Sequence, residues 1–270
     1  GKKQKYIYIE IQVEWMKDGK KRDFAVQLRY QSPQSVYVIP VGGWDKFKEF
    51  YDDKLLPRIV YVPPFSGLEP SEQWHDDSIL RKQAGKGQPG SVLRNLLYRV
   101  VDRNLGVETE KDNNTTDWKE IQAVVKRFFS VQLEKPRYRK GVDTEIICEY
   151  IDDRSKKNFD IISGGSGFHQ TLTLLAFMYG YEGLTTILFD EPDAHMFVNL
   201  QRETLDYFQR KSSEKNIQFL IATHAEELIK GVEAENIISV SEGKPKRISA
   251  TPEIITALSD VTNEHYFDLM

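Results

Sequence analysis

The sequence predicts an α/β protein in which an antiparallel β-subdomain and a helical arm accompany a lobe built on a parallel sheet. The β-subdomain is indicated by alternating apolar and polar residues, as in a meander of strands, over residues 6–15, 24–30 and 36–41. The lobe is indicated by short apolar strands that alternate with helices from residue 159 onward, which is typical of parallel strands. We therefore expect a single domain whose three parts cover residues 1–66, 67–158 and 159–270.

One short strand and one helix connect the β-subdomain to the arm. "RIVYVPPFSG", residues 58–67, is a buried strand that two prolines stop. A helix follows Ser91, with an apolar face formed by Val92, Leu93, Leu96, Leu97, Val100 and Val101. The opposite, solvent side of this helix is expected to carry Arg94, Arg99 and Arg103.

The rest of the arm contains one more helix and a strand or hairpin. Asp117 and Glu120 form a capping pair that predicts a helix over residues 118–129. After the basic turn "EKPRYRKG", the strand or hairpin is expected over 144–150.

The lobe alternates between the two element types along its length. Helices are expected over residues 171–179, 199–209 and 226–230. Strands of the parallel layer are expected over residues 185–190, 217–222 and 237–240.

Composition limits the class of protein. The 270 residues are 40% hydrophobic and 29% charged, which is enough for one large domain or two small ones with a full core. A formal net charge of -4 gives no global attraction to nucleic acid. Cys148 is the only cysteine, so no disulfide forms within the chain, and no apolar run approaches the ~20 residues that cross a bilayer. We expect a cytoplasmic protein without a membrane partner.

Two adjacent carboxylates stand at the end of an apolar strand in "TTILFDEPDAHM", residues 185–196. Asp190 and Glu191 follow the strand directly, and Pro192 prevents the strand from continuing. Charged carboxylates are rarely buried without compensation, which a metal ion, a nucleotide phosphate with its metal, or an arginine would provide. A capping role at the start of the next helix is the simpler alternative.

Two further motifs share the lobe with this acid pair. "IISGGSGFHQ", residues 161–170, is a turn of small residues that opens a helix, so its hydroxyl and N–H groups suit a phosphate, although tight packing alone also requires such turns. "FLIATHAEEL", residues 219–228, is a buried strand followed by His224, which in isolation is an ordinary surface or core group. The order and spacing of the three motifs resemble the ABC ATPase class, and more narrowly the SMC, RecF and OLD-like ATPases of DNA maintenance and phage defence.

The resemblance implies a P-loop NTPase head that binds ATP and Mg²⁺ and forms a homodimer around the nucleotide. Asp190 resembles the Walker B aspartate that holds Mg²⁺, and Glu191 resembles the glutamate that polarises the attacking water. His224 resembles the switch histidine that contacts the γ-phosphate.

Two other segments take their roles from the same resemblance. The family's signature motif, which reaches the ATP held by the dimer partner, corresponds here to Ser163, Gly164, Gly165 and Ser166. Asp193 stands where the D-loop begins at the dimer seam. The sequence then departs from the family, because the usual Leu-His-Pro is replaced by Met196, Phe197 and Val198.

The family's phosphate-binding loop, G-x-x-x-x-G-K-[ST], is missing from the 270 residues. "GKGQPGS", residues 85–91, is a near miss that contains proline and follows no strand. We expect this Walker A segment upstream of the chain, with a degenerate ATPase as the alternative, and we expect these residues alone to be inactive. The end of the chain resembles the link from which OLD-like proteins continue into a nuclease or other effector domain.

Three functions stay open at this point. The first is an ATPase head for DNA repair, DNA maintenance or antiphage defence, the second is a non-hydrolysing dimerisation scaffold, and the third is an ABC transporter subunit. The transporter is disfavoured because Ser166 stands where its signature has glutamine. DNA contacts, if present, are expected at three basic clusters: Lys17/Lys20/Lys21/Arg22, Arg81/Lys82/Lys86 and Lys135/Arg137/Arg139/Lys140.

Overall fold

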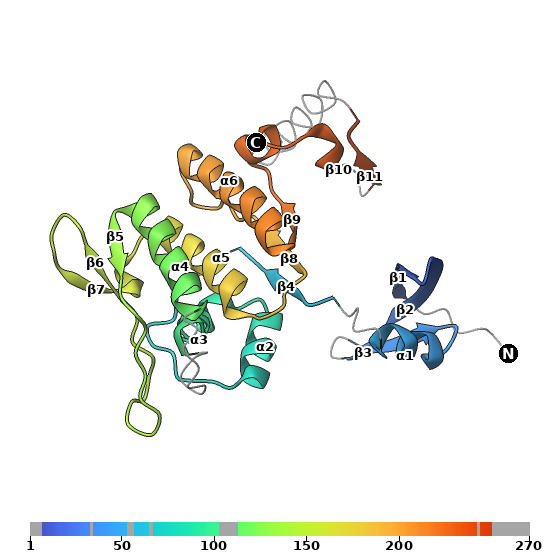
Figure 1. Cartoon of the computed structure of the whole chain (residues 1–270), viewed down its shortest axis with the longest axis horizontal. Coiled ribbons are helices and arrows are strands. Elements are labelled where there is room, and N and C mark those ends of the chain that lie inside the picture. Colours follow the sequence, from blue (N-terminus) through green and yellow to red (C-terminus); the bar gives the residue numbers. More distant parts are fainter. Residues whose placement is uncertain are drawn as a thin grey trace. The chain divides into compact units, whose positions relative to one another are not determined.

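The chain divides into two units, one ending at Pro57 and the other beginning at Arg58 (Figure 1). The computed structural model describes residues 7–32, 35–52, 57–64, 67–102, 113–241 and 244–249. Each unit is described by itself. Within the described residues, no helix combines the length and the apolar composition needed to cross a bilayer.

The first unit is the predicted antiparallel meander with one added helix. Strands β1 (Tyr8–Lys17), β2 (Lys20–Ser32) and β3 (Ser35–Val41) pair in sequence order. The β1–β2 hairpin closes on Asp18 and Gly19, whose φ angles of 51° and 72° are those of a tight hairpin turn. Helix α1 (Trp44–Asp52), which the sequence analysis did not predict, contributes Phe47 and Phe50 to an aromatic cluster with Trp15 and Phe24.

The second unit is built on a parallel sheet of order β4-β8-β9. Its strands are β4 (Ile59–Val62), β8 (Thr186–Asp190) and β9 (Gln218–Ala222). The adjacent parallel pair β8 and β9 is the pairing that the sequence predicted, and it is confirmed. The short strand stopped by prolines is β4, which pairs parallel with β8 on its other side.

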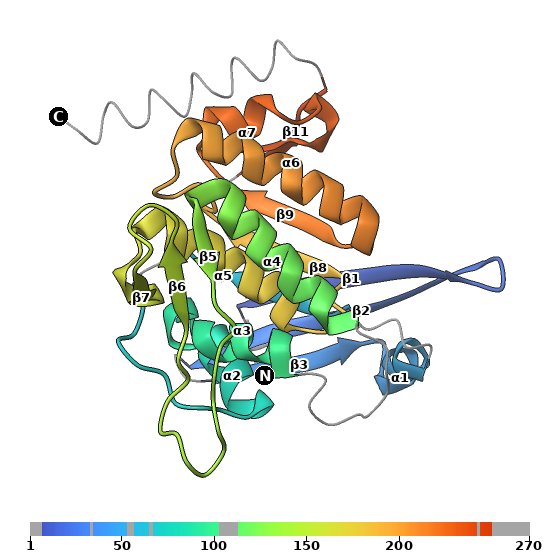
Figure 2. The ribbon, with the colours of Figure 1, turned by 60° about the vertical axis from the view of Figure 1, so that its left-hand side comes forward.

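One face of this sheet is covered by helices. In α6 (Val198–Lys215), Phe208 stacks on Phe189 of β8 and Phe219 of β9, with ring centroids 4.9 and 5.1 Å apart. Helix α5 (Ser166–Gly180) also contacts the sheet and is buried continuously from Phe168 to its end. Its second half is apolar on all sides, while the polar side chains of His169, Thr171 and Thr173 in its first half contact main-chain carbonyls. Figure 2 shows α6 beside β9 and α5 beside α4.

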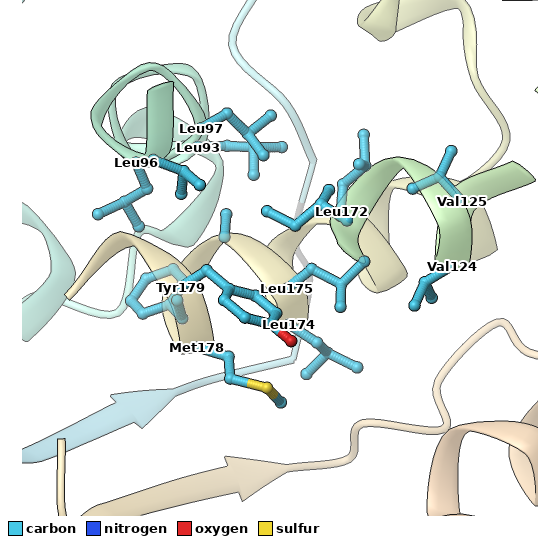
Figure 3. Packing of buried hydrophobic residues seen from close by; sticks show 14 of the residues in the cluster. Leu93, Leu96, Leu97, Val124, Val125, Leu172, Leu174, Leu175, Met178 and Tyr179 are labelled. Carbon is cyan, nitrogen blue, oxygen red and sulfur yellow. The ribbon is translucent and has the colours of Figure 1, made fainter. Parts of the chain in front are cut away.

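Helix α5 packs on its other side against α3 (Leu93–Asp102) and α4 (Asn113–Phe129). Figure 3 shows the leucines of α3 pointing toward α5, where they meet Leu172 and Leu175. Gly180 lies at a close approach of the two helices, because a Cβ atom at this position would lie 3.0 Å from side-chain atoms of Leu96. The leucines of this interface belong to the main hydrophobic core of the second unit.

The remaining elements lie around this core. Along the chain, β4 is followed by α2 (Asp77–Gly85) and by a 3-10 turn, η1 (Pro89–Ser91), before α3 begins. A small antiparallel sheet contains β5 (Val131–Leu133), β6 (Glu149–Asp152) and β7 (Asn158–Asp160). The chain continues through η2 (Ile161–Ser163) into α5, and after β9 through α7 (Glu226–Lys230), η3 (Ala234–Asn236), β10 (Ile238–Ser241) and β11 (Lys244–Arg247).

Several expected boundaries are wrong. The helix expected to begin after Asp117 begins at Asn113, and Asp117 pairs with Lys215 at 3.1 Å instead of capping a helix. The strand expected over 144–150 begins only at Glu149, preceded by an isolated bridge between Arg137 and Ile147. Strand β10 is not a member of the parallel layer, because it pairs antiparallel with β11.

The arginines expected on the solvent side of α3 behave differently from one another. Arg94 is buried, which contradicts the prediction, and only 1% of its side chain is exposed. Arg99 is partly exposed and pairs with Asp77. Arg103 lies outside the described residues, as does the link expected at the end of the chain.

Candidate functional site

The two predicted acids lie at the carboxyl end of β8, where the chain turns sharply. Asp190 is the last residue of the strand, and Glu191 has a left-handed backbone with φ of 50°. A non-glycine residue in this conformation costs about 1 kcal/mol, so the turn must be held by its surroundings. The Glu191 N–H donates to the carbonyl of Ala222 at 2.9 Å, and the Glu191 carbonyl accepts from the N–H of Ala194 at 3.0 Å.

His224 meets Glu191 at this edge of the sheet. Parallel neighbouring strands end on the same side, so the residues that follow β8 and β9 lie close together. The imidazole Nε2 lies 3.1 Å from Glu191 Oε1, with 60% of the histidine side chain and 32% of the glutamate side chain exposed. Because a carboxylate oxygen accepts, Nε2 carries the hydrogen in this contact. The structure therefore joins two of the predicted catalytic residues.

Asp193, which follows the end of β8, is joined by a hydrogen bond to Thr223, the residue directly after β9. Its carboxylate accepts a hydrogen bond from the Thr223 hydroxyl, whose oxygen accepts from the N–H of Ala225 at 3.0 Å. Asp193 thus fixes the loop that carries His224. Thr223 was not predicted as a site residue.

Tyr61 is a second residue that the sequence analysis missed. Its hydroxyl donates to Asp190 Oδ2 at 2.8 Å from the neighbouring strand β4. The hydrogen bond to Asp190 raises the pKa of Tyr61, so the phenol stays protonated and remains a donor at neutral pH. The hydroxyl therefore holds one oxygen of Asp190 and orients the other.

We expect Tyr61→Phe to raise the Mg²⁺ concentration needed for half-maximal ATP turnover about threefold to tenfold, equivalent to roughly 1 kcal/mol. Without the hydroxyl, the Asp190 carboxylate loses its fixed orientation. The measurement is a magnesium titration of ATPase activity in the full-length protein, with Tyr37→Phe on the exposed face of β3 as control. Equal magnesium requirements in the two variants would remove Tyr61 from the site.

The signature turn, residues 163–166, lies at the same edge. Only a short connection joins α5 to β8, so the two run antiparallel and the start of α5 lies over the end of β8. A Cβ atom at Gly167 would lie 2.9 Å from the carbonyl oxygen of His195, which places the first turn of α5 directly against the D-loop. Gly165 is the N-cap residue and Ser166 begins the helix, so the N–H groups of its first turn are at this end.

The residues present fit a magnesium ion. Among the described residues, no group of three or more His, Cys, Asp or Glu side chains is arranged to hold a metal ion. Mg²⁺ bound with a nucleotide does not require such a group, because one or two carboxylates, phosphates and water complete its shell. Asp190, at the strand end and oriented by Tyr61, is the carboxylate that would hold it.

Five members of the predicted basic clusters, all in the part of the chain that the structure describes, form ion pairs with acidic side chains. The pairs are Lys21–Glu14 at 2.8 Å, Arg22–Glu49 at 3.5 Å, Arg81–Asp77 at 3.7 Å, Arg139–Asp143 at 2.8 Å and Arg137–Glu149. Lys140 lies 5.5 Å from the ring centroid of Trp74. These five of the eleven members would have to exchange an acidic partner for a phosphate, which lowers their value as DNA contacts.

A parallel sheet with two adjacent acids at a strand end, and a helix N-terminus beside them, is an arrangement suited to a nucleotide phosphate with its metal ion. The model of the family described as "AAA ATPase domain" matches residues 93–229, which are 137 of the 270 residues. The chain belongs to this family. The match includes α5, the acid pair and His224, and it confirms the expected ATPase class. No curated protein matches the chain.

The chain is also similar to solved heads of SMC proteins. An SMC head bound to the C-winged helix domain of ScpA is 14% identical, with 92% of this chain and 76% of that chain covered and a TM-score of 0.49. The SMC head domain from Thermotoga maritima is 12% identical over 90% of this chain and 75% of its own, with a TM-score of 0.43. An SMC ATPase described for its ATP-driven dimerization and DNA stimulated activation is 23% identical over 53% of this chain and 87% of its own, with a TM-score of 0.40.

Proposed function

We propose that the protein is an ATP-hydrolysing head that dimerises around ATP. The observation that carries this proposal is the meeting of Asp190, Glu191 and His224 at one edge of the parallel sheet, with the start of α5 at the same edge. Membership of the AAA ATPase domain family supports the use of ATP and Mg²⁺.

Each residue has a role that its position supports. Glu191 accepts a proton from the attacking water, and its contact with His224 holds the carboxylate beside the γ-phosphate. Asp190 holds Mg²⁺, which would supply positive charge to the phosphates when bound. The signature turn presents the Ser163 hydroxyl and the N–H groups at the start of α5 to the nucleotide of the partner copy.

We expect two inactive variants to restore activity when they are mixed. Glu191→Gln removes the base and Ser163→Arg blocks the signature turn, so neither variant alone should turn over ATP. A heterodimer has one site in which both contributions are intact. Random pairing gives about one heterodimer in two, so an equal mixture should recover about a quarter of wild-type turnover. The measurement is ATP hydrolysis by the mixed full-length proteins at a concentration where dimers form.

A chain carrying both substitutions is the control for this experiment. Mixed with either single variant, it forms no intact site, so activity should stay at the background level. Failure of the two single variants to complement each other would contradict a site shared between two copies.

The wider role that we propose is DNA maintenance or antiphage defence, with DNA or a nuclease or other effector as partner. Five of the eleven residues in the basic clusters are paired with acidic side chains, so this part of the proposal depends on the family resemblance of the motifs and not on surface charge. A non-hydrolysing dimerisation scaffold is the second candidate. It is favoured by one observation, the lack of a G-x-x-x-x-G-K-[ST] motif in these residues.

A further inference from the structure

A buried arginine lies directly behind the signature turn. Arg94, in the first turn of α3, donates from Nη2 to Asp160 Oδ1 at 2.7 Å and from Nη1 to Asp160 Oδ2 at 3.0 Å. Its Nη2 also approaches the carbonyl of Pro70 at 3.3 Å. Such a two-bonded arginine–carboxylate pair fixes both direction and distance between its partners.

Asp160 passes this constraint to the turn. It is the last residue of β7 and caps the 3-10 turn η2, accepting from the N–H of Ile162 at 2.9 Å. The oxygen that accepts this N–H is the same Oδ1 that accepts from Arg94. The peptide that leads into Ser163 is therefore tied to α3 through a single carboxylate.

The turn is also held from inside. The carbonyl of Ile161 accepts from the N–H of Gly164 at 3.1 Å and lies 2.6 Å from Nε2 of His169. Since a carbonyl oxygen only accepts, the buried imidazole donates from Nε2. Burial lowers the pKa of His169, which keeps the ring neutral and leaves the positive charge of this region to Arg94.

Arg94 itself is anchored at its other end. The buried carboxylate of Glu72 accepts from the main-chain N–H of Arg94 at 2.8 Å and from that of Asn95 at 2.9 Å, and so caps α3 from a distant segment. The main-chain carbonyl of Glu72 accepts from the N–H of Ile146 at 2.9 Å. The main chain of Arg94 is therefore held in place by Glu72, and its guanidinium extends from a fixed helix end.

We propose that Arg94 is a positioning residue for the signature turn: through Asp160 it sets the orientation of the Ser163 hydroxyl and of the N–H groups at the start of α5. The role rests on the proposed function, in which this turn acts on the partner's nucleotide. An ordinary surface arginine would be solvated, whereas this one is 1% exposed and its charged group is directed at the residue that caps the turn.

The test is Arg94→Met in the full-length protein, with Arg99→Met on the same helix as the matched control. We expect kcat for ATP to fall about 10-fold to 100-fold, the scale of a small misplacement of a reacting group. The KM for ATP should change less than about twofold, because the substitution does not remove a contact that holds the nucleotide equally in the ground state and the transition state. Hydrogen exchange at the amides of residues 162–165 should accelerate about 10-fold relative to those of 172–178 inside α5.

The double variant Arg94→Met/Asp160→Asn separates positioning from stability. Asparagine still caps Ile162 and removes the charge left without its arginine, so the melting temperature should recover while kcat stays low. Recovery of kcat together with stability, or unchanged exchange at residues 162–165 in Arg94→Met, would overturn the inference. If wild-type protein hydrolyses no ATP, the proposed function fails, and the exchange measurement still decides whether Arg94 holds the turn.

Discussion

Replacing Glu191 by glutamine should lower ATP turnover of the full-length protein by about 10²–10⁴-fold, the range for loss of a general base. The amide keeps the shape of the side chain, and its oxygen still accepts a hydrogen bond from His224, so the site geometry is retained. It cannot accept a proton from water at neutral pH. ATP binding, measured by titration with a fluorescent analogue, should stay within about twofold of the wild type.

This substitution should also trap the dimer. If hydrolysis separates the two copies, a variant that binds ATP without cleaving it accumulates the ATP-bound dimer, which sedimentation velocity detects. Glu226→Gln is the matched control, because Glu226 is exposed on α7 and pairs with Lys230. Turnover by Glu191→Gln at the level of this control would exclude Glu191 as the base. If the wild type and Glu191→Gln bind ATP equally well and neither hydrolyses it, the non-hydrolysing scaffold would be favoured instead.

The parts of the fold that the sequence predicted are those set by hydrophobic periodicity. The pairing of β8 with β9 and the burial of α5 follow from their runs of apolar residues. The expected burial of β4 and β9 is wrong, because β4 is buried on one face only and β9 contains no fully buried residue. The β1–β2 hairpin has alternating strands and an Asp-Gly turn, both local signals. These elements were found near their expected positions.

The other incorrect predictions have a common cause: each residue or strand interacts with a partner that is distant in the sequence or was not predicted. Asp117 looks like a helix cap in the sequence, but Lys215 from α6 pairs with it, while the helix begins four residues earlier. Arg94 lies on the polar side of α3, and nothing local distinguishes it from a solvated arginine, because Asp160 is 66 residues away. The strand that became β10 finds its partner in β11 and not in the parallel layer.

The candidate site shows the same division. Asp190, Glu191 and His224 were predicted together because the order and spacing of their motifs resemble the ABC ATPase class. The structure brings Glu191 and His224 into contact because the parallel strands β8 and β9 end on the same edge of the sheet. Tyr61 was not predicted, since its contact with Asp190 depends on β4 joining the sheet beside β8. The left-handed backbone of Glu191 was also not predictable, because it is imposed by the hydrogen bonds of the turn and not by the residue type.

We expect the 270 residues by themselves to bind ATP weakly and to hydrolyse essentially none. No G-x-x-x-x-G-K-[ST] motif is present to hold the β- and γ-phosphates, which carry most of the nucleotide's charge. Asp190, Glu191 and His224 act on a phosphate that is already positioned, and the signature turn is proposed to serve the partner's nucleotide. The measurement compares ATP binding and phosphate release by this chain and by the full-length protein.

The parallel sheet gives a physical reason to expect a further segment beside these residues. Parallel sheets are normally covered on both faces, yet the second unit exposes Ile59 by 54%, Tyr61 by 44% and Leu220 by 49% on the face opposite α5 and α6. A phosphate-binding loop with its helix, supplied in a longer chain or as a separate one, should restore binding and hydrolysis together. The isolated chain with a Glu191→Gln substitution gives the background rate. Hydrolysis by the unsubstituted isolated chain clearly above that rate would show that these residues already contain a phosphate-binding loop of another sequence.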